Sequence, residues 1–326
     1  MDSDSLDSCF MATLPNQQIW VPSLFSGSER TTERFWEFFT VNIRNRNTRK
    51  AYLQAVRQFA HAVQIYGVYD LTQIRPMHVA AYIEKRLEYS SKPTVKQHLA
   101  ALRALFDWMV VGHAIEFNPA SAVRGPKYSV KKGKTPVLSG AESRALLNSI
   151  DDSTLIGKRD KALIALMIYS FARIGAALSM NGSDYYIANR KGRIRLHEKG
   201  GKEQDVPCHR MLDEVMEDYI VSSNLAGHPS APLFQSARSK SDTLSGRRML
   251  PADAYRMIRR RAVSAGIQAK IGNHTFRATG ITAYLRNGGR LEIAQQIAGH
   301  ESSRTTGLYD RREDDISIDE IERIIL

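Results

Sequence analysis

Hydrophobic side chains between about residues 29 and 125 recur at the spacing of helices rather than of strands. The clearest run is expected to start at a cap formed by Asn47, and its apolar positions follow i, i+4, i+7, i+8 and i+11: Tyr52, Val56, Phe59, Ala60 and Val63. An aromatic run from Phe35 to Phe39 precedes it. Two further apolar stripes follow, one starting at Pro76 and one running from Val95 to Met109. Four helices with short connections predict a small bundle.

The second half of the chain begins with a further helix signal. Ser139 and Glu142 have the spacing of a capping box, and an apolar helical run extends from Leu163 to Phe171. Two more helices are predicted at about residues 210–223 and 251–265. This half therefore also contains several helices.

Strand signals lie between these helices. The segment from Tyr185 to Leu196 is typical of a hairpin that turns at Asn189–Gly192, and Gln204–Pro207 is a candidate third strand. The segment from Ser236 to Arg248 is polar and basic, and we expect it to be a loop. The predicted fold class is mainly α with a small β-sheet, namely a helical bundle followed by a mixed α+β domain.

Composition shifts divide the chain into four parts. We expect a flexible arm at 1–28, docked through Trp20 and Phe25, a helical domain at 29–124, a basic linker at 125–138 and a mixed domain at 139–326. The last part ends in an apolar stripe on a charged tail, for which a helix is predicted: Ile316, Ile318, Ile321, Ile324, Ile325 and Leu326.

The charge balance points to a polyanionic partner. The 326 residues carry a net charge of +12, and residues 29–138 alone hold 18 Lys and Arg against 8 Asp and Glu. Such an excess favours nucleic acid or an anionic membrane surface. No apolar run approaches membrane-spanning length, the start Met1-Asp-Ser-Asp lacks the basic residues of a signal peptide, and only two cysteines are present. We therefore expect a cytosolic or nuclear protein that binds DNA or RNA and no membrane.

The basic residues cluster at predicted helix starts and in the linker. These clusters are the candidate phosphate contacts: Arg44, Arg46, Arg49, Lys50, Lys92, Lys96, Lys131, Lys132 and Lys134.

Two short motifs near the end of the sequence carry the candidate chemistry. His274 and Arg277 stand three apart, after a cap at Gly272-Asn273, so both project from one face of a helix start. A helix N-terminus that carries His and Arg suits a phosphate group. His300 and Tyr309 lie nine residues apart, across a segment that we expect to form a loop and a short helix.

These motifs resemble the final boxes of the tyrosine recombinase (phage integrase) family, His-x-x-Arg and Gly-His-x-x-x-x-Thr-Thr-x-x-Tyr. Arg173 matches the family's first catalytic arginine, and Lys199 in the segment Lys-Gly-Gly-Lys matches its lysine on a β-hairpin. The resemblance extends from about residue 30 to the end of the sequence. It implies a SAM-like core-binding domain followed by the family's catalytic domain.

The sequence departs from the family pattern around the first arginine. It has Ser170-Phe-Ala-Arg173-Ile-Gly-Ala176, without the usual glycine and without the acidic residue three positions after the arginine. What supports the Arg173 side chain is therefore an open question. Ala278 also stands where many members have a second histidine.

The resemblance implies one role for each residue in strand cleavage. Arg173 and Arg277 would bind the non-bridging oxygens of the scissile phosphate bidentately, as an ammonium group cannot. Tyr309 would attack with His274 as base, Lys199 would protonate the leaving 5′-oxygen, and His300 would hydrogen-bond the phosphate. The product would be a 3′-phosphotyrosine that keeps the bond energy, so no cofactor, neither metal nor ATP, is expected.

The function that this resemblance implies is site-specific recombination of double-stranded DNA. We expect a bacterial cytoplasmic enzyme, associated with the nucleoid or a plasmid, that is a monomer or weak oligomer off DNA and a homotetramer on paired sites. It would act in integration, excision or resolution of mobile or plasmid DNA. The alternatives are a type IB topoisomerase and a catalytically silent DNA-binding regulator. Two further alternatives, a metal site at His274 and His300 and a Mg²⁺ nuclease that uses Asp310, lack the required carboxylate cluster.

Overall fold

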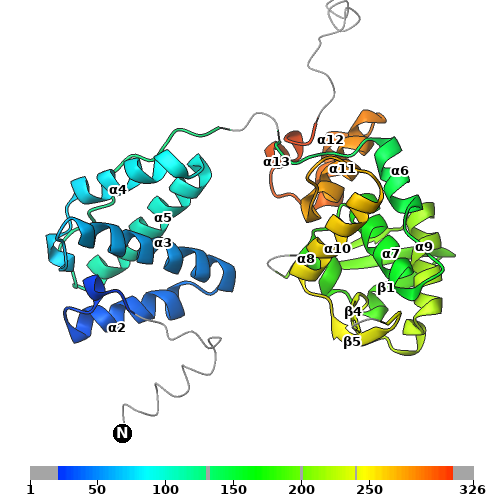
Figure 1. The fold of residues 1–326 in the computed structure, drawn as a ribbon, viewed down its shortest axis with the longest axis horizontal. Helices are drawn as coiled ribbons and strands as arrows, with labels where there is room; N and C mark the ends of the chain where they lie inside the picture. Colours follow the sequence, from blue (N-terminus) through cyan, green and yellow to red (C-terminus); the bar gives the residue numbers. More distant parts are fainter. Residues whose placement is uncertain (1–20, 130–132, 199–200, 239–240, 311–326) are drawn as a thin grey trace, which may run out of the picture. The chain divides into compact units, whose positions relative to one another are not determined.

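The chain folds into two compact units in a computed structural model that describes residues 21–129, 133–198, 201–238 and 241–310 (Figure 1). The division falls between Met1–Ser129 and Val130–Leu326. Each unit has its own hydrophobic core. The predicted C-terminal tail helix lies outside the described residues.

The first unit is a helical bundle, as its apolar periodicity predicts. Its helices are α2 (Glu29–Glu37), which continues as a π-helical turn (Phe38–Asn42), α3 (Arg46–Ile65), α4 (Pro76–Tyr89) and α5 (Lys92–Val111), with short 3₁₀ turns at Ser23–Phe25 and Leu71–Gln73. Phe59 on α3 joins three helices, since its ring centroid lies 5.3 Å from that of Tyr82 on α4 and 5.9 Å from that of Phe106 on α5. Aromatic edge contacts of this kind stabilise the bundle beyond simple burial.

Helix α3 starts two residues earlier than we predicted. Its cap is Asn45, not Asn47: the Asn45 Oδ1 atom accepts from the backbone N–H of Asn47 at 3.0 Å and from that of Thr48 at 3.1 Å. The Arg49 guanidinium donates two hydrogen bonds to the Ile43 carbonyl, which holds the entering chain against the first turn. The Asn45 side chain therefore accepts hydrogen bonds from backbone N–H groups that have no partner within the first turn of α3.

The bundle includes residues that precede its first helix. Phe25 is fully buried, and its ring centroid lies 5.0 Å from that of Phe35 on α2. The predicted docking through Phe25 is therefore confirmed, whereas Trp20 lies outside the described residues. Burial of an aromatic side chain is worth a few kcal/mol, so this segment adds to the stability of the bundle.

The second unit is built around one long apolar helix, α7. Its helices are α6 (Gly140–Asn148), α7 (Leu155–Tyr169), α8 (Ile174–Ser179), α9 (Arg210–Ser222), α10 (Pro251–Ser264), α11 (Asn273–Arg286), α12 (Leu291–Ala298) and α13 (Ser303–Gly307). Ala162 to Ile168 are all buried, because α7 packs against α9 and α11 (Figure 1). The predicted capping box that opens α6 is present, with reciprocal hydrogen bonds between Ser139 and Glu142.

A three-stranded antiparallel sheet, in the order β1-β2-β3, lies beside these helices. Its strands are β1 (Tyr185–Ala188), β2 (Lys191–His197) and β3 (Glu203–Pro207). Asn189 and Arg190 form the turn between β1 and β2 with φ of 52° and 62°. Positive φ at both central residues matches the twist of a tight hairpin. The predicted hairpin and third strand are confirmed.

The predicted loop at Ser236–Arg248 is wrong, since a second sheet forms there. Strands β4 (Gln235–Ala237) and β5 (Leu244–Arg248) pair antiparallel. Both strands are short and lack alternating hydrophobic residues, so the sequence pattern does not reveal them. Contacts with distant residues hold them instead: the Arg159 guanidinium donates to the Gln235 carbonyl at 2.9 Å, and the Arg248 guanidinium donates to the carbonyls of Leu178 and Met180.

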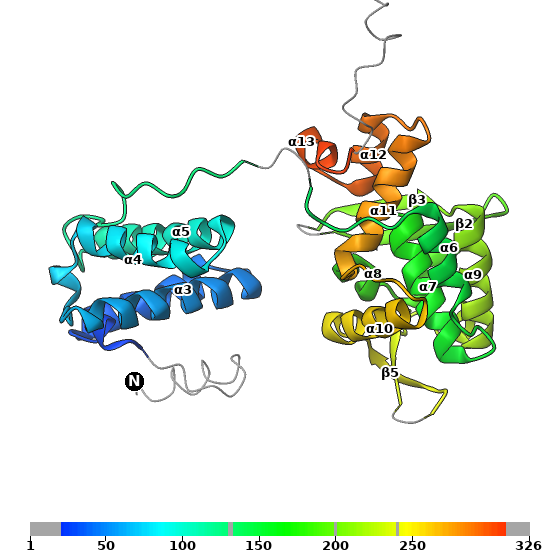
Figure 2. The ribbon, with the colours of Figure 1, turned by 45° about the horizontal axis from the view of Figure 1, so that its top comes forward.

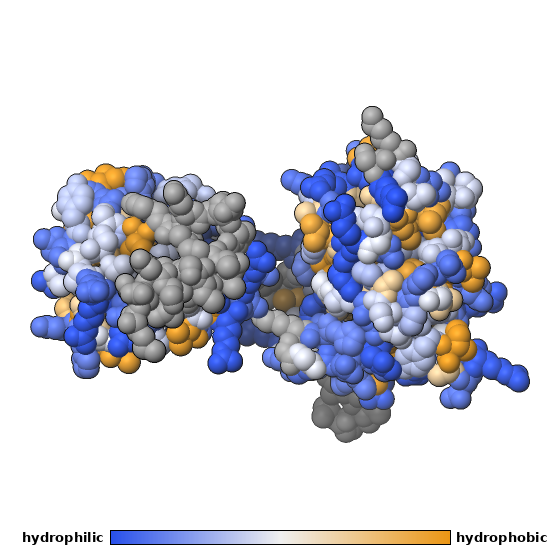
Figure 3. All heavy atoms as spheres, turned by 90° about the horizontal axis from the view of Figure 1, so that it is seen from below, coloured by the Kyte–Doolittle hydropathy of each residue, from blue (hydrophilic) through white to orange (hydrophobic). Residues whose placement is uncertain are grey.

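The surface drawn in Figure 3 is mostly hydrophilic on both units, with hydrophobic side chains in small separate patches. Among the described residues, no helix is both long enough and apolar enough to span a membrane.

Candidate active site

Helix α11 approaches α7 very closely, and this brings Arg277 to the end of α7. A Cβ atom added at Gly280 would lie 1.9 Å from the Ile168 carbonyl oxygen and within 3 Å of the Phe171 ring. Any side chain at position 280 would therefore force the two helices apart. Gly280 therefore permits the close packing of α11 on α7, whose ribbons lie side by side in Figure 2, and Arg277 on α11 is buried.

The Arg277 side chain is 2% exposed and is held by two backbone carbonyls. Its guanidinium donates to the carbonyl oxygens of Phe171 and Ala298, and the nearby Tyr309 side chain raises its pKa. Burial and the neighbouring Arg173 lower the pKa of Arg277 to about 10, so the group stays charged at neutral pH. The site thus holds a buried cation in a fixed orientation.

At position 171, where the family usually has glycine, the backbone adopts a left-handed conformation that is typical of glycine. Phe171 stands there with φ of 56°, in the left-handed region that non-glycine residues occupy at a cost of about 1–3 kcal/mol. Its ring is 4% exposed and contacts the Tyr284 ring at a centroid distance of 6.1 Å, while its carbonyl accepts from Arg277. Burial of the ring offsets the backbone strain, so the chain still turns toward Arg173 without the glycine.

His300 lies where α12 ends in a left-handed Gly299 with φ of 56°. The imidazole is 9% exposed, and its Nδ1 atom lies 2.9 Å from the Oγ1 atom of the fully buried Thr306. This hydrogen bond leaves Nε2 for another partner. The predicted Thr-Thr segment therefore contributes directly to the orientation of the ring.

Tyr309 follows the short helix α13 and lies inside the same cluster. Its ring is nearly parallel to that of His300, with a centroid distance of 5.9 Å and an interplanar angle of 7°. The Thr282 hydroxyl on α11 donates to the Tyr309 carbonyl at 2.9 Å, and the Gly133 N–H donates to the Leu308 carbonyl at 2.9 Å. Backbone contacts on both sides thus hold the tyrosine in the site of its own chain.

His274 and His300 are both electrostatically biased toward the neutral form. Desolvation, followed by the charges of Arg277 and Arg173, lowers the pKa of both groups, and that of His300 falls to about 4. In the protein without DNA both imidazoles are therefore neutral at pH 7. A neutral imidazole can accept a proton, which the base role requires.

Acidification is expected to destabilise the fold between pH 6.5 and about 4. Unfolded histidine binds its proton near pH 6.5, whereas burial lowers the pKa of both His300 and the buried His98 to about 4. The unfolded state thus binds more protons in this window, so stability is full above it and falls by roughly 3 kcal/mol per group at most on descending through it. Urea titrations from pH 7 to pH 4 measure this loss.

The variants His300→Gln and His98→Gln should each flatten that pH dependence, while His61→Gln, a change at an exposed histidine, should leave it unchanged. An equal slope in all four proteins would mean that neither buried histidine is responsible.

Arg173 caps the start of α8, and its side chain forms an ion pair with Glu198, whose side chain is 5% exposed. Glu198 ends the segment before Lys199, which lies outside the described residues. The Glu198 N–H donates to the Lys202 carbonyl at 2.7 Å, closing the chain on either side of that lysine. The structure therefore brings together five of the six residues predicted to be catalytic: Arg173, His274, Arg277, His300 and Tyr309.

Sequence reasoning missed Glu198. The signal that could have found it is an acidic residue directly before the expected catalytic lysine, in a segment otherwise rich in basic residues.

The candidate phosphate contacts are mostly exposed. Lys134 in the second unit has an exposed side chain. So do five of the candidates in the first unit: Arg44, Arg46, Lys50, Lys92 and Lys96. Arg49 is engaged with the Ile43 carbonyl, and Lys131 and Lys132 lie outside the described residues. Helices α3, α4 and α5 have no acidic residue in their first turns, so nothing there neutralises the positive helix ends.

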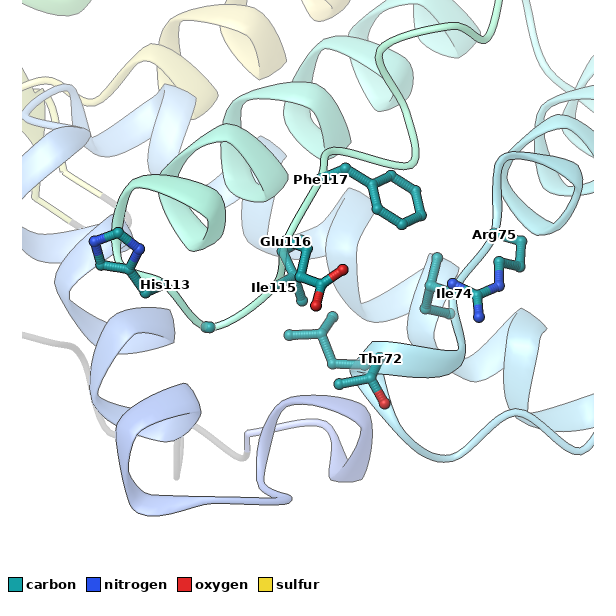
Figure 4. Close-up of a pocket in the computed structure, with 9 residues that line it drawn as sticks. Thr72, Ile74, Arg75, His113, Ile115, Glu116 and Phe117 are labelled. Carbon is teal, nitrogen blue, oxygen red and sulfur yellow. The ribbon is translucent and has the colours of Figure 1, made fainter.

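Two hollows differ in their relation to these residues. A cavity of about 580 Å³ in the first unit, between the segments 71–75 and 113–117, contains none of the predicted catalytic residues (Figure 4). A groove of about 300 Å³ in the second unit is lined by His300, by residues of α12, and by Lys202 and Glu301. Within the described part of the chain, no cluster of three or more His, Cys, Asp or Glu could hold a metal ion.

Comparison with known proteins agrees with this geometry. Residues 136–315 match the model of the phage integrase family, and residues 33–111 match the phage integrase N-terminal SAM-like domain. The tyrosine recombinase XerC of Syntrophus aciditrophicus is 30% identical over 282 residues, covering 81% of this chain and 86% of the relative. XerC of Thermodesulfovibrio yellowstonii is 26% identical over 270 residues, covering 81% and 85%.

Solved structures share the fold. XerH recombinase bound to its palindromic difH substrate, after cleavage, matches with a TM-score of 0.65 and 19% identity over 93% of this chain and 89% of that one. A lambda integrase tetramer bound to a Holliday junction matches with a TM-score of 0.67 and 15% identity over 97% and 89%. The predicted fold class is confirmed. The chain belongs to the phage integrase family and is a tyrosine recombinase, an enzyme that acts on DNA.

Proposed function

We propose that this recombinase cleaves a DNA strand with the Tyr309 hydroxyl and rejoins it through a covalent 3′-phosphotyrosine. The observation that carries this proposal is the position of the Tyr309 side chain, which stacks on His300 and lies close enough to the buried Arg277 to raise the pKa of that guanidinium. A nucleophile needs a nearby cation to lower the energy of the developing phenolate and of the phosphorane-like transition state.

The charge distribution supports phosphate as the missing ligand. Arg173 and Arg277 lie close enough for the charge of Arg173 to depress the pKa of Arg277, so positive charge is in excess in the site. Binding the non-bridging oxygens of a phosphodiester would relieve that excess. We assign this role to Arg173 and Arg277 together.

The remaining roles follow from position and chemistry. His274, neutral at pH 7, is the proposed base for the Tyr309 proton. With Nδ1 of His300 accepting from the Thr306 hydroxyl, Nε2–H would donate to a phosphate oxygen. Lys199 is the proposed acid for the leaving 5′-oxygen, on its family resemblance alone. No step in this scheme calls for a metal or ATP, because the phosphotyrosine conserves the bond energy.

We further propose recombination between paired sites rather than relaxation of one duplex. The related XerH is solved on its difH site and lambda integrase as a tetramer on a Holliday junction, and this chain shares their fold. A supercoiled plasmid carrying two target sites distinguishes the possibilities. Site-dependent deletion or inversion supports a recombinase, site-independent relaxation indicates a topoisomerase-like enzyme, and binding without any covalent adduct indicates a silent regulator.

Deleting residues 316–326 is expected to abolish the paired-site complex while leaving single-site binding within about threefold. Ile318, Ile321 and Ile325 recur at i, i+3 and i+7, so a helix here would carry a narrow apolar stripe suited to a neighbouring protomer. Native gels with one-site and two-site DNA measure both complexes. Loss of thermal stability in the DNA-free truncated protein would show instead that the tail packs on its own domain.

DNA affinity is expected to fall steeply with salt, because the basic helix starts and the linker imply many phosphate contacts. About six contacts predict a slope of log K against log salt of about −5 on B-DNA. Neutralising Lys131, Lys132 and Lys134 together should make that slope shallower by up to ~3. Fluorescence anisotropy between 50 and 300 mM salt, roughly the range where such slopes are measured, provides the values. If the triple variant keeps the wild-type slope, the linker does not contact DNA.

The proposed substrate is the DNA of a bacterial chromosome, plasmid or mobile element. The proposed location is therefore the bacterial cytoplasm, with the nucleoid or a plasmid. The named relatives are bacterial recombinases, and the enzyme acts on DNA. Integration, excision and resolution use the same strand chemistry, so the choice among them rests on the target sites.

A further inference from the structure

Glu198 is a buried carboxylate at the edge of the catalytic cluster. Its side chain is 5% exposed, and its Oε2 atom pairs with the Arg173 guanidinium. Its second oxygen, Oε1, is buried and has no hydrogen-bond partner among the residues that the structure describes. A buried carboxylate is costly unless it is paired, so this ion pair is the interaction that makes Glu198 tolerable there.

Arg173 lacks an acidic partner on its own helix. Three positions after it, on the same face of α8, stands Ala176, which is 5% exposed and has no group that could bind a guanidinium. The Arg173 side chain is 36% exposed, and within the described part of the chain its ion-pair partner is Glu198, 25 residues later. An arginine on this helix without a partner would sample many rotamers.

We infer that Glu198, directly after strand β2, is the positioning residue for Arg173 and replaces the support that α8 does not provide. This inference rests on the proposed role of Arg173 in binding the scissile phosphate. One arm of the guanidinium is held by Glu198, which leaves the other N–H groups to face the phosphate in a fixed orientation. Glu198 also raises the pKa of the neighbouring Arg277, opposing the effects of burial and of Arg173.

The location of Glu198 gives this ion pair a second consequence. The residue lies directly before Lys199, and its N–H closes the backbone onto Lys202. On the preceding side, the His197 Nε2 atom lies 3.1 Å from a carboxylate oxygen of the buried Asp184. The arginine that binds the phosphate is thus tied to the strand end that leads into the proposed acid.

The competing explanation is that Glu198 occupies the seat of the phosphate. A carboxylate on an arginine can mimic a bound anion and would have to be displaced when DNA binds. The two explanations predict opposite results for removal of the charge. If Glu198 positions Arg173, removing its charge slows cleavage. If Glu198 competes with the phosphate, removing its charge speeds cleavage.

The test compares Glu198→Gln and Glu198→Asp with the wild type on a nicked suicide substrate, under single-turnover conditions with saturating enzyme. Glu198→Gln is expected to lower the cleavage rate by about 10- to 100-fold, since a catalytic group displaced by about 1 Å loses about that much. DNA affinity should change by less than about threefold. Glu198→Asp, which keeps the charge, should recover part of the rate. Glu214→Gln is the matched control, because it removes a 52%-exposed carboxylate that pairs with Arg210 on α9.

A methylphosphonate at the scissile position separates positioning from a general structural defect. This group lacks the anionic charge that Arg173 would bind, so the penalty of Glu198→Gln should shrink to within about threefold. Both substrates are cleaved by the same preparation, so the ratio of penalties does not depend on how much protein is folded. An equal loss on both substrates would assign Glu198 a merely structural role and overturn the inference.

The remaining outcomes of the test each decide against one of the two proposals, either the positioning role of Glu198 or the phosphate-binding role of Arg173. Faster cleavage by Glu198→Gln, or a rate within twofold of the wild type, overturns the inference in favour of competition or of no role. Arg173→Ala serves as the reference for the proposed function. If Arg173→Ala cleaves normally, the proposed role of Arg173 fails. If it loses cleavage while Glu198→Gln does not, the positioning role alone fails.

Discussion

We expect Tyr309→Phe to abolish covalent attachment to DNA, with a loss of at least about 10³-fold in the rate of adduct formation. The substitution removes the oxygen that is proposed to form the bond to phosphorus and keeps the ring that stacks on His300. The backbone contacts of this segment, from Thr282 to the Tyr309 carbonyl and from Gly133 to the Leu308 carbonyl, do not involve the phenol. Binding of a target site should therefore stay within about twofold.

A nicked suicide substrate resolved on a denaturing gel measures the adduct, and a native gel measures binding. Tyr284→Phe is the matched control, because Tyr284 lies in the same apolar cluster as Tyr309. It should form adduct at close to the wild-type rate. A covalent band that persists in Tyr309→Phe would place the nucleophile at another residue and remove the basis of the proposed mechanism.

Arg277→Lys is expected to lower the cleavage rate by about 10²–10³-fold, the usual loss when one preorganised charge donor to a transition state is removed. An ammonium group cannot bind two phosphate oxygens in the fixed fork geometry of a guanidinium. It also cannot donate to the carbonyls of Phe171 and Ala298 together in the geometry that the Arg277 guanidinium adopts. Each buried carbonyl left without a donor costs about 1–3 kcal/mol, so the melting temperature should fall as well.

Two readouts separate these effects. The cleavage rate is measured at a temperature well below the melting transition of the variant, where nearly all molecules are folded. Arg286→Lys, at the exposed end of the same helix α11, is the control and should change neither rate nor stability. If Arg277→Lys loses stability but cleaves within tenfold of the wild type, the residue braces the fold and does not stabilise the transition state.

Local patterns in the sequence were sufficient to predict most of the helices and the sheet of three strands. The stripe from Tyr52 to Val63 and the all-round apolar run of α7 each lie within one element, so their periodicity is visible without the fold. The hairpin likewise depends on neighbours, since Asn189 and Arg190 alone set the turn. The start of α3 was missed, because two asparagines compete there and a contact from Arg49 to Ile43 selects Asn45.

The candidate site was only partly predictable. His300 and Tyr309 are near in sequence, so their pairing follows from spacing and a motif, and the structure stacks their rings. The acceptors that orient Arg277 are backbone carbonyls 106 and 21 residues away. Every residue has a carbonyl, so no side-chain pattern could have marked these two. The same holds for β4, which depends on a hydrogen bond from Arg159 to the Gln235 carbonyl.

The sequence by itself determined the family resemblance, the residue types of the catalytic set and the helical class of both units, because each of these depends on identity and spacing along the chain. Only the tertiary structure decided how Arg173 is supported and how the chain turns without the usual glycine. Glu198 meets Arg173 across 25 residues, and Phe171 keeps a left-handed backbone because its ring is buried. Both outcomes depend on which surfaces pack together, and packing is a property of the folded chain rather than of any local segment.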